Sequence, residues 1–121
     1  MATEFSIEDR RAGEGVHVVA VTGEIDLFTA PEFKQRVMAP IAAGTDRVIV
    51  DLTRTTFIDS SSLGVLIGAN RRLKGRGGRL IVACSSDPIV KTFRITGLDG
   101  VFTLVDSLDA ALDESSSAEA A

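Results

Sequence analysis

The 121-residue sequence contains no tryptophan and no tyrosine, and it has one cysteine and one histidine. Cys84 has no second cysteine to pair with, and its place in an apolar run favours a buried structural thiol. His17 alternates with valines, as an outward-facing strand residue does. The carboxylates are scattered and form no nucleophile-base pair or metal-ligand spacing. The sequence therefore predicts neither an enzyme nor a bound cofactor or metal.

Two longer features are also missing. No apolar run approaches the roughly 18 residues of a membrane span, and the first ten residues lack the basic and then apolar layout of a signal peptide. We therefore expect a cytoplasmic protein with no membrane contact. The net charge of -4 and the lack of tryptophan and tyrosine for base stacking argue against direct nucleic-acid binding. One basic cluster gathers near the end of a predicted helix, where its negative terminus favours cations: Arg71, Arg72, Lys74, Arg76 and Arg79.

What the sequence does have is apolar patterning for one domain. The pattern predicts strands at residues 5–7, 16–21, 48–52, 80–84 and 101–105, and helices at 29–44, 60–74, 87–97 and 108–112. Parallel neighbouring strands need a crossover helix, so this order predicts an α/β fold with a mixed β-sheet of about five strands covered by about four helices. We expect the domain to span residues 1–114 and a flexible, polar tail to follow at 115–121.

Local signals refine three of these elements. Residues 10–15, rich in glycine and charge, predict a hairpin turn, and residues 53–56 predict a polar connection after the third strand. Thr29 and Glu32 predict a capping box at the start of the first helix, with Pro31 in its first turn. Pro40 should kink that helix or shorten its last turn.

The stretch that organises the chain is a strand, a loop and a helix between residues 48 and 73. Asp59 and Ser60 fall where the helix should begin, and both are good N-cap residues. Because unpaired N–H groups and the helix dipole favour negative charge at this end, a phosphate on a serine here would be accommodated. The simpler interpretation is that Asp59 and the serines only cap the helix, and position alone does not decide between the two.

The same helix has two different faces. Leu63, Leu66 and Leu73 lie on one side, while the opposite side carries small and polar residues: Ser61, Gly64, Gly68 and Arg72. Glycine on an outward face lets another backbone approach closely. We therefore predict that this face forms a partner surface; the alternative is that Gly64 and Gly68 pack against a loop of the same chain.

Three segments appear together in one order: GEID at 23–26, DLTRTTFIDSSSLGVL at 51–66 and FRITGL at 93–98. Together they resemble the bacterial anti-sigma factor antagonists, which are stand-alone STAS domains, and the resemblance covers residues 3–112. It implies a switch protein. The unmodified form would bind an anti-sigma factor that is also a serine kinase, so that a sigma factor is released, and phosphorylation of one serine would end the binding. A serine phosphatase would restore the first state.

The resemblance also implies roles for individual residues. The family's phosphoacceptor follows the Asp of its D-S-[ST]-G-L-G motif and falls on Ser60, with Ser61 as the close rival. The acidic residue of the G-E-[IL]-D motif supports partner binding and falls on Asp26, and Asp59 is the other acidic neighbour. The sequence departs from the motif at Ser62, where the family usually has glycine. This substitution adds a third hydroxyl close to where the kinase would approach.

The expected partner surface thus consists of eight residues: Asp26, Asp59, Ser60, Ser61, Ser62, Gly64, Gly68 and Arg72. The alternative is a STAS domain that serves only as a scaffold or interaction module, as in a stressosome-like assembly or a lipid-transport complex, without a phosphorylation cycle. A serine at the acceptor position favours the switch.

Overall fold

The computed structural model describes residues 4–120, and the side chains of residues 4–116. Ten elements follow one another: β1 (Ser6–Gly13), β2 (Val16–Ile25), α1 (Ala30–Ala42), β3 (Arg47–Ile58), α2 (Ser60–Lys74), β4 (Arg79–Ala83), α3 (Asp87–Ile95), the 3-10 helix η1 (Leu98–Gly100), β5 (Thr103–Val105) and α4 (Leu108–Ala120). The five strands form one sheet. This confirms the predicted α/β class, the mixed sheet and the helices over it.

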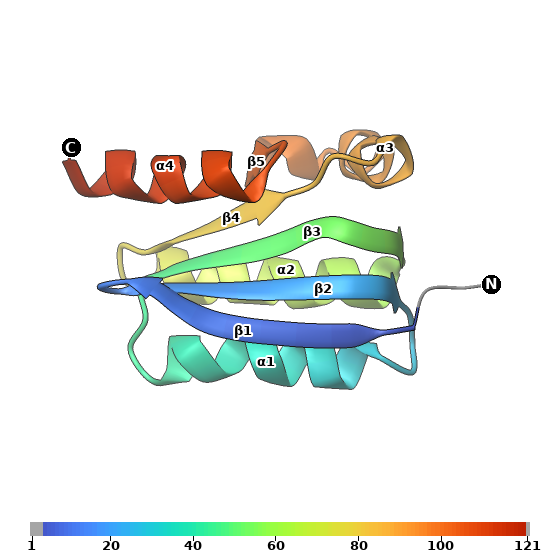
Figure 1. The fold of residues 1–121 in the computed structure, drawn as a ribbon, viewed down its shortest axis with the longest axis horizontal. Helices are drawn as coiled ribbons and strands as arrows, with labels where there is room; N and C mark the ends of the chain where they lie inside the picture. The colour runs from blue at the N-terminus through green and yellow to red at the C-terminus, as the bar shows by residue number, and fades with distance from the viewer. Residues whose placement is uncertain (1–3, 121) are drawn as a thin grey trace.

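The sheet positions the site through its strand directions. Its order is β1-β2-β3-β4-β5; β1 runs antiparallel to β2, and every other neighbouring pair is parallel. The carboxyl ends of β2 and β3 therefore lie at the same edge, where α1 and α2 begin (Figure 1). In open α/β sheets this edge is where binding sites form.

The two faces of the sheet are covered unequally. The larger core lies between the sheet and α1, α2 and α3, and it includes Phe33, Leu66 and Phe93. The smaller core joins Ala111 of α4 to Ile49 and Ile81. Both faces of β3 are thus packed in the middle of the sheet, which explains its unbroken apolar run. On this second face α4 also packs against Val16 and Val18 at the start of β2. Within residues 4–120, no helix lies over the rest of β1 and β2 (Figure 1).

Three of the strands, β1, β2 and β3, are longer than predicted. β3 continues through residues 53–56 to Ile58, so the prediction of a polar connection at 53–56 is wrong. Its polar residue Thr55 is buried, and its hydroxyl donates to the Val21 carbonyl at 2.9 Å. β1 continues to Gly13, which limits the hairpin turn to residues 14–15 rather than 10–15. Backbone pairing with β2 overrides the local turn and loop composition in both cases.

The first helix begins and ends differently from its prediction. Thr29 is the N-cap of α1, but its side chain makes no capping bond to the helix, so the Thr29–Glu32 capping box is wrong. The Thr29 hydroxyl is already engaged, because it donates to the Glu24 carbonyl at 3.1 Å and accepts from the Asp26 N–H at 2.8 Å. Pro40 lies inside the helix, which ends at Ala42 and not at the predicted residue 44.

The last helix is longer than predicted. α4 runs from Leu108 to Ala120, whereas the pattern predicts a helix at residues 108–112, so it extends over most of the tail predicted at 115–121. Ser115 is buried, and its carbonyl accepts from Arg47 Nη1 at 2.9 Å. Glu114 pairs with Arg79 at 3.2 Å. These contacts hold the helix against the sheet through polar groups, which an apolar pattern does not reveal. Ala121 lies outside the described residues.

Candidate functional site

The register between β2 and β3 brings two distant segments together. Ile25 at the end of β2 pairs with Ile58 at the end of β3. The residues that follow, Asp26 and Asp59, therefore begin neighbouring connections at the same edge. We refer to residues 26–29 as the β2–α1 loop and to residues 59–62 as the α2 turn. The acidic residue of the GEID segment thus lies beside the serine-containing turn.

The α2 turn is closed by reciprocal capping. Asp59 is the N-cap, with extended backbone angles (φ -130, ψ -172), and its Oδ1 accepts from the Ser62 N–H at 3.2 Å. In return, the Ser62 hydroxyl accepts from the Asp59 N–H at 3.3 Å. This confirms Asp59 as the N-cap and makes Ser60 the first helical residue. Ser60 is exposed and Ser61 is half-buried.

Ser62 differs from its two neighbours because its side chain is 0% exposed. Its hydroxyl donates to the Ile25 carbonyl at 3.0 Å. The serine that stands in place of the usual glycine therefore points into the protein and ties the α2 turn to the end of β2. This corrects the expectation that Ser62 offers a third hydroxyl to a kinase or a direct contact to a partner.

The β2–α1 loop is organised around Asp26. Its Oδ1 accepts from the Phe28 N–H at 2.9 Å and from the Thr29 N–H at 3.1 Å. The Asp26 carbonyl accepts from the Ala30 N–H at 2.8 Å, which starts α1. These bonds satisfy backbone donors at the helix start, in place of the predicted capping box. Asp26 is half-buried, and its carboxylate fixes the shape of the loop.

The exposed face of α2 agrees with the helical wheel at most positions. Leu63, Leu66 and Leu73 are buried, whereas Gly64 and Arg72 are exposed. A methyl group added at Gly64 or at Gly68 would meet nothing within 4 Å among the described residues. Neither glycine packs against a neighbouring loop of the described chain, so that alternative explanation of the two glycines is wrong.

The buried side of α2 is not purely apolar. Ile67, which follows the buried Leu66, is 36% exposed. The buried stripe is completed by Ala69 and by Asn70, which is 6% exposed. The hydrophobic character of a single residue is thus a weaker guide than its angle on the helix.

Three exposed apolar residues next to the α2 turn were not predicted as functional. We call Leu27, Phe28 and Phe57 the apolar rim; their side chains are 70%, 89% and 44% exposed. Leu27 and Phe28 belong to the β2–α1 loop, and Phe57 pairs with Glu24 one residue before the Ile25–Ile58 pair. The sequence does contain a signal for these three residues. Leu27 and Phe28 directly follow Asp26, and Phe57 directly follows the polar residues 53–56.

The sequence of this chain is similar to known protein families. The family model of the STAS domain matches residues 9–111 of this chain. The chain belongs to the STAS domain family. Its curated relatives include the anti-sigma-B factor antagonist of Listeria monocytogenes, which is 34% identical over 71% of this chain and 75% of the relative. Within the family, this STAS domain therefore belongs with the anti-sigma factor antagonists.

Solved structures agree with this placement. The crystal structure of an anti-sigma factor antagonist from Mycobacterium paratuberculosis is 31% identical and covers 94% of both chains with a TM-score of 0.81. The phosphorylated form of the Bacillus cell fate determinant SpoIIAA is 25% identical, with a TM-score of 0.70 over 92% of this chain and 98% of the other. The fold of this STAS domain is thus that of an anti-sigma factor antagonist.

Among the described residues, the pKa values of Asp9 and Cys84 are shifted. Arg36 of α1 donates to Asp9, and His17 lies 3.1 Å from the same carboxylate. The Arg36 hydrogen bond holds the pKa of Asp9 below its usual range, with a smaller contribution from His17. Burial raises the pKa of the Cys84 thiol, so Cys84 is a poor nucleophile, as expected for a structural thiol.

The predicted basic cluster separates into two groups. Arg76 lies 3.7 Å from Asp46, and Arg79 is paired with Glu114. The other three cations, Arg71, Arg72 and Lys74, occupy the last turn of α2 and are exposed. Position at the negative helix end accounts for all three. Arg71 and Arg72 lie three and four residues after Gly68, on the side of α2 that carries Gly64 and Gly68.

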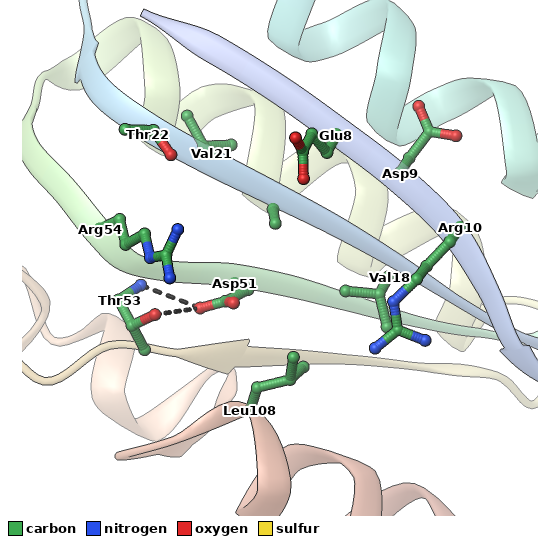
Figure 2. A pocket seen from close by; sticks show the side chains of 11 residues that line it. Glu8, Asp9, Arg10, Val18, Val21, Thr22, Asp51, Thr53, Arg54 and Leu108 are labelled. Carbon is green, nitrogen blue, oxygen red and sulfur yellow. Dashed lines mark hydrogen bonds between the residues drawn. The ribbon is translucent and has the colours of Figure 1, made fainter.

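A separate hollow of about 620 Å³ lies on the second sheet face, beside Leu108 of α4. Figure 2 shows its side chains, which include the acidic Glu8, Asp9 and Asp51 and the basic Arg10 and Arg54. Asp51 is engaged, because it accepts from the Thr53 N–H at 3.0 Å and the Thr53 hydroxyl at 2.7 Å. No residue of the α2 turn lines this hollow.

Two further kinds of site are missing from the part of the chain that the structure describes. Among the described residues, no group of three or more histidine, cysteine or acidic side chains is placed to hold a metal ion. Within the same part of the chain, none of the helices combines the length and the apolar character needed to span a bilayer.

Proposed function

We propose that this STAS domain is a phosphorylation-controlled antagonist of an anti-sigma factor. The unphosphorylated form binds an anti-sigma factor that is also a serine kinase, and a sigma factor is released. Phosphorylation of Ser60 ends the binding, and a serine phosphatase restores it. The observation that carries this proposal is the exposed Ser60 hydroxyl at the first position of α2, beside the β2–α1 loop.

The burial of the three serines supports Ser60 as the acceptor. A kinase must reach the hydroxyl, and Ser60 is exposed whereas Ser61 is half-buried and Ser62 is fully buried. The start of α2 also offers backbone N–H groups and the positive end of the helix dipole to a phosphate. Ser61 remains the rival acceptor.

The effect of the phosphate on binding must be large. It brings about 1.5 to 2 negative charges to a turn that already contains Asp59 and lies beside Asp26. Shifting an equilibrium from almost all bound to almost all unbound requires about 5.5 kcal/mol, whereas one exposed charge pair at 4 Å contributes roughly 1 kcal/mol. Repulsion across water is therefore too weak. We propose that the partner removes Ser60 from water, so that a phosphate loses hydration as well.

The exposed face of α2 supplies the rest of the proposed surface. Gly64 and Gly68 have open space above them, so a partner backbone can approach the helix closely. Arg72 extends the same face toward the end of the helix. Asp26 and Asp59 contribute as the residues that shape the two connections, and Ser62 contributes by joining them.

The partners follow from this proposal: an anti-sigma factor with serine kinase activity and a serine phosphatase, both acting in the cytoplasm, with no direct contact to nucleic acid or membrane. We do not expect this STAS domain to be an enzyme, because its role is to bind and to accept a phosphate. Any catalysis in the cycle belongs to the partners.

The proposal is tested by fragment mass spectrometry after incubation with ATP and an extract of the protein's own cells. We expect phosphate on Ser60 and none in the Ser60→Ala variant. Phosphate on Ser61 would keep the switch and change the acceptor. If an extract that is active on a control substrate adds no phosphate, the scaffold alternative becomes the better explanation.

A further inference from the structure

The apolar rim is unusual for its exposure and its position. Single exposed apolar side chains are normal on protein surfaces, whereas groups of them mark interaction sites. Phe28, at 89%, is the most exposed large apolar side chain among the described residues. Leu27 is its neighbour in the chain, and Phe57 lies at the adjoining strand end through the register of β2 and β3. All three residues thus gather at the edge that carries the α2 turn.

The loop that carries Phe28 is held in one shape by its own hydrogen bonds. Asp26 accepts from the Phe28 and Thr29 N–H groups, and the Thr29 hydroxyl bonds to Glu24. None of these bonds involves the side chain at position 27 or 28. Folding therefore does not require an apolar residue at either position. A loop that is already ordered loses little entropy when it binds, which suits an anchor residue.

We infer that the apolar rim is the anchor of the partner surface, and that the protein covering Ser60 offers Phe28 an apolar pocket bordered by Leu27 and Phe57. This inference rests on the proposed function, since the partner is taken to be the anti-sigma factor. The rim and the α2 turn adjoin, and an interface of ordinary size, about 800 Å² on each partner, covers both. Aromatic side chains in such pockets commonly dominate the affinity of an interface.

The rim also supplies a cause for the sensitivity to phosphate. Apolar contacts around a polar group exclude water from it, which strengthens every charge interaction there. With the rim seated in its pocket, Ser60 is shielded from solvent. A phosphate at that position then loses hydration that it would keep on an open surface. The affinity contributed by the apolar rim and the loss of affinity on phosphorylation of Ser60 are thereby linked.

The first test compares Phe28→Ala with Ile95→Ala, using calorimetry against the purified anti-sigma factor that co-purifies with the wild-type chain. Ile95 is a matched control because it is 74% exposed and lies on α3. We expect Phe28→Ala to weaken binding at least about tenfold and Ile95→Ala to stay within about twofold of wild type. Both variants should keep the wild-type melting temperature. Equal affinities of the two variants would overturn the inference.

The outcome for the wild-type chain separates this inference from the proposed function. If the wild-type chain binds no anti-sigma factor, both fail together. If it binds and Phe28→Ala binds equally well, only the anchor fails and the proposed function stands.

A second test measures the link between the rim and the serine. Ser60→Asp is introduced into the wild-type chain and into the Phe28→Ala variant, and the loss of affinity is compared. Because the rim shields Ser60, we expect the loss to be at least about threefold smaller in the Phe28→Ala background, as coupled sites show non-additive effects. Equal losses would show that the rim does not shield the serine.

Discussion

The helices α1 and α2 start at the same edge of the sheet, after parallel strands that pair residue by residue, yet their first turns differ. The α2 turn closes on itself through Asp59 and Ser62, and the Ser62 hydroxyl reaches back to β2. The β2–α1 loop uses Asp26 to hold its backbone and projects Leu27 and Phe28 outward. One connection is anchored inward and exposes a hydroxyl, while the other exposes apolar surface.

This difference shows that a capping motif in the sequence does not guarantee the capping hydrogen bonds. Neighbouring groups can form hydrogen bonds with the same side chain instead. Thr29 and Glu32 match the capping box, but the Thr29 hydroxyl bonds to Glu24 and Asp26. Ser62 is not a usual N3 partner, yet it completes the box with Asp59. The bonds of each first turn depend on the strand end that lies beside it.

Changing the charge of the α2 turn should have the largest effect. We expect Ser60→Asp to weaken binding to the anti-sigma factor at least about 100-fold, because several kcal/mol of hydration are lost in the interface. Ser60→Ala should bind like the wild-type chain. Calorimetry measures both. Wild-type affinity for Ser60→Asp would contradict the proposed desolvation, and an unchanged melting temperature confirms that folding is intact.

Removing the hydrogen bond between Ser62 and the Ile25 carbonyl should destabilise the fold. Ser62→Ala leaves the Ile25 carbonyl and the Asp59 N–H without their buried partner, and we expect a loss of about 1 to 3 kcal/mol in the free energy of unfolding. Ser60→Ala, two residues away, should stay within about 0.5 kcal/mol of wild type. Urea denaturation compares them. Equal stabilities would show that the link between the turn and β2 is not important.

Filling the exposed face of α2 should affect binding and leave the fold intact. A larger side chain at Gly68 has open space around it, so we expect Gly68→Leu to fold normally and to bind the anti-sigma factor about tenfold more weakly. Gly78→Ala is the opposite control, because an added Cβ would lie 2.2 Å from the Asp46 carbonyl oxygen and destabilise the fold. Wild-type affinity for Gly68→Leu would remove this face from the partner surface.

The start of α1 should show the smallest effect. Asp26→Ala removes the acceptor of two backbone N–H groups, and we expect a loss of about 1 kcal/mol in stability, as for a lost N-cap. Glu32→Ala should change stability by less than about 0.5 kcal/mol, because Glu32 forms no capping box in this structure. Thermal denaturation of both variants gives the comparison. A larger loss of stability for Glu32→Ala would support the predicted Thr29–Glu32 capping box.

The sequence alone was sufficient for the features that depend on local patterning. Strand and helix order, the buried stripe of Leu63, Leu66 and Leu73, and Asp59 as an N-cap follow from periodicity and from short-range capping chemistry. The three family segments were sufficient for the STAS domain. These features are readable because each depends on residues within a few positions of one another.

The tertiary structure decided what depends on pairing between distant segments. Only the register of β2 and β3 places Asp26 beside the α2 turn, buries Thr55 in an extended strand and turns Ser62 inward to Ile25. The same register gathers Leu27, Phe28 and Phe57 into one rim. Sequence patterns describe neighbours along the chain, whereas the Thr55 and Ser62 hydrogen bonds join residues 34 and 37 positions apart. The burial and exposure of these residues are therefore fixed only when the sheet forms.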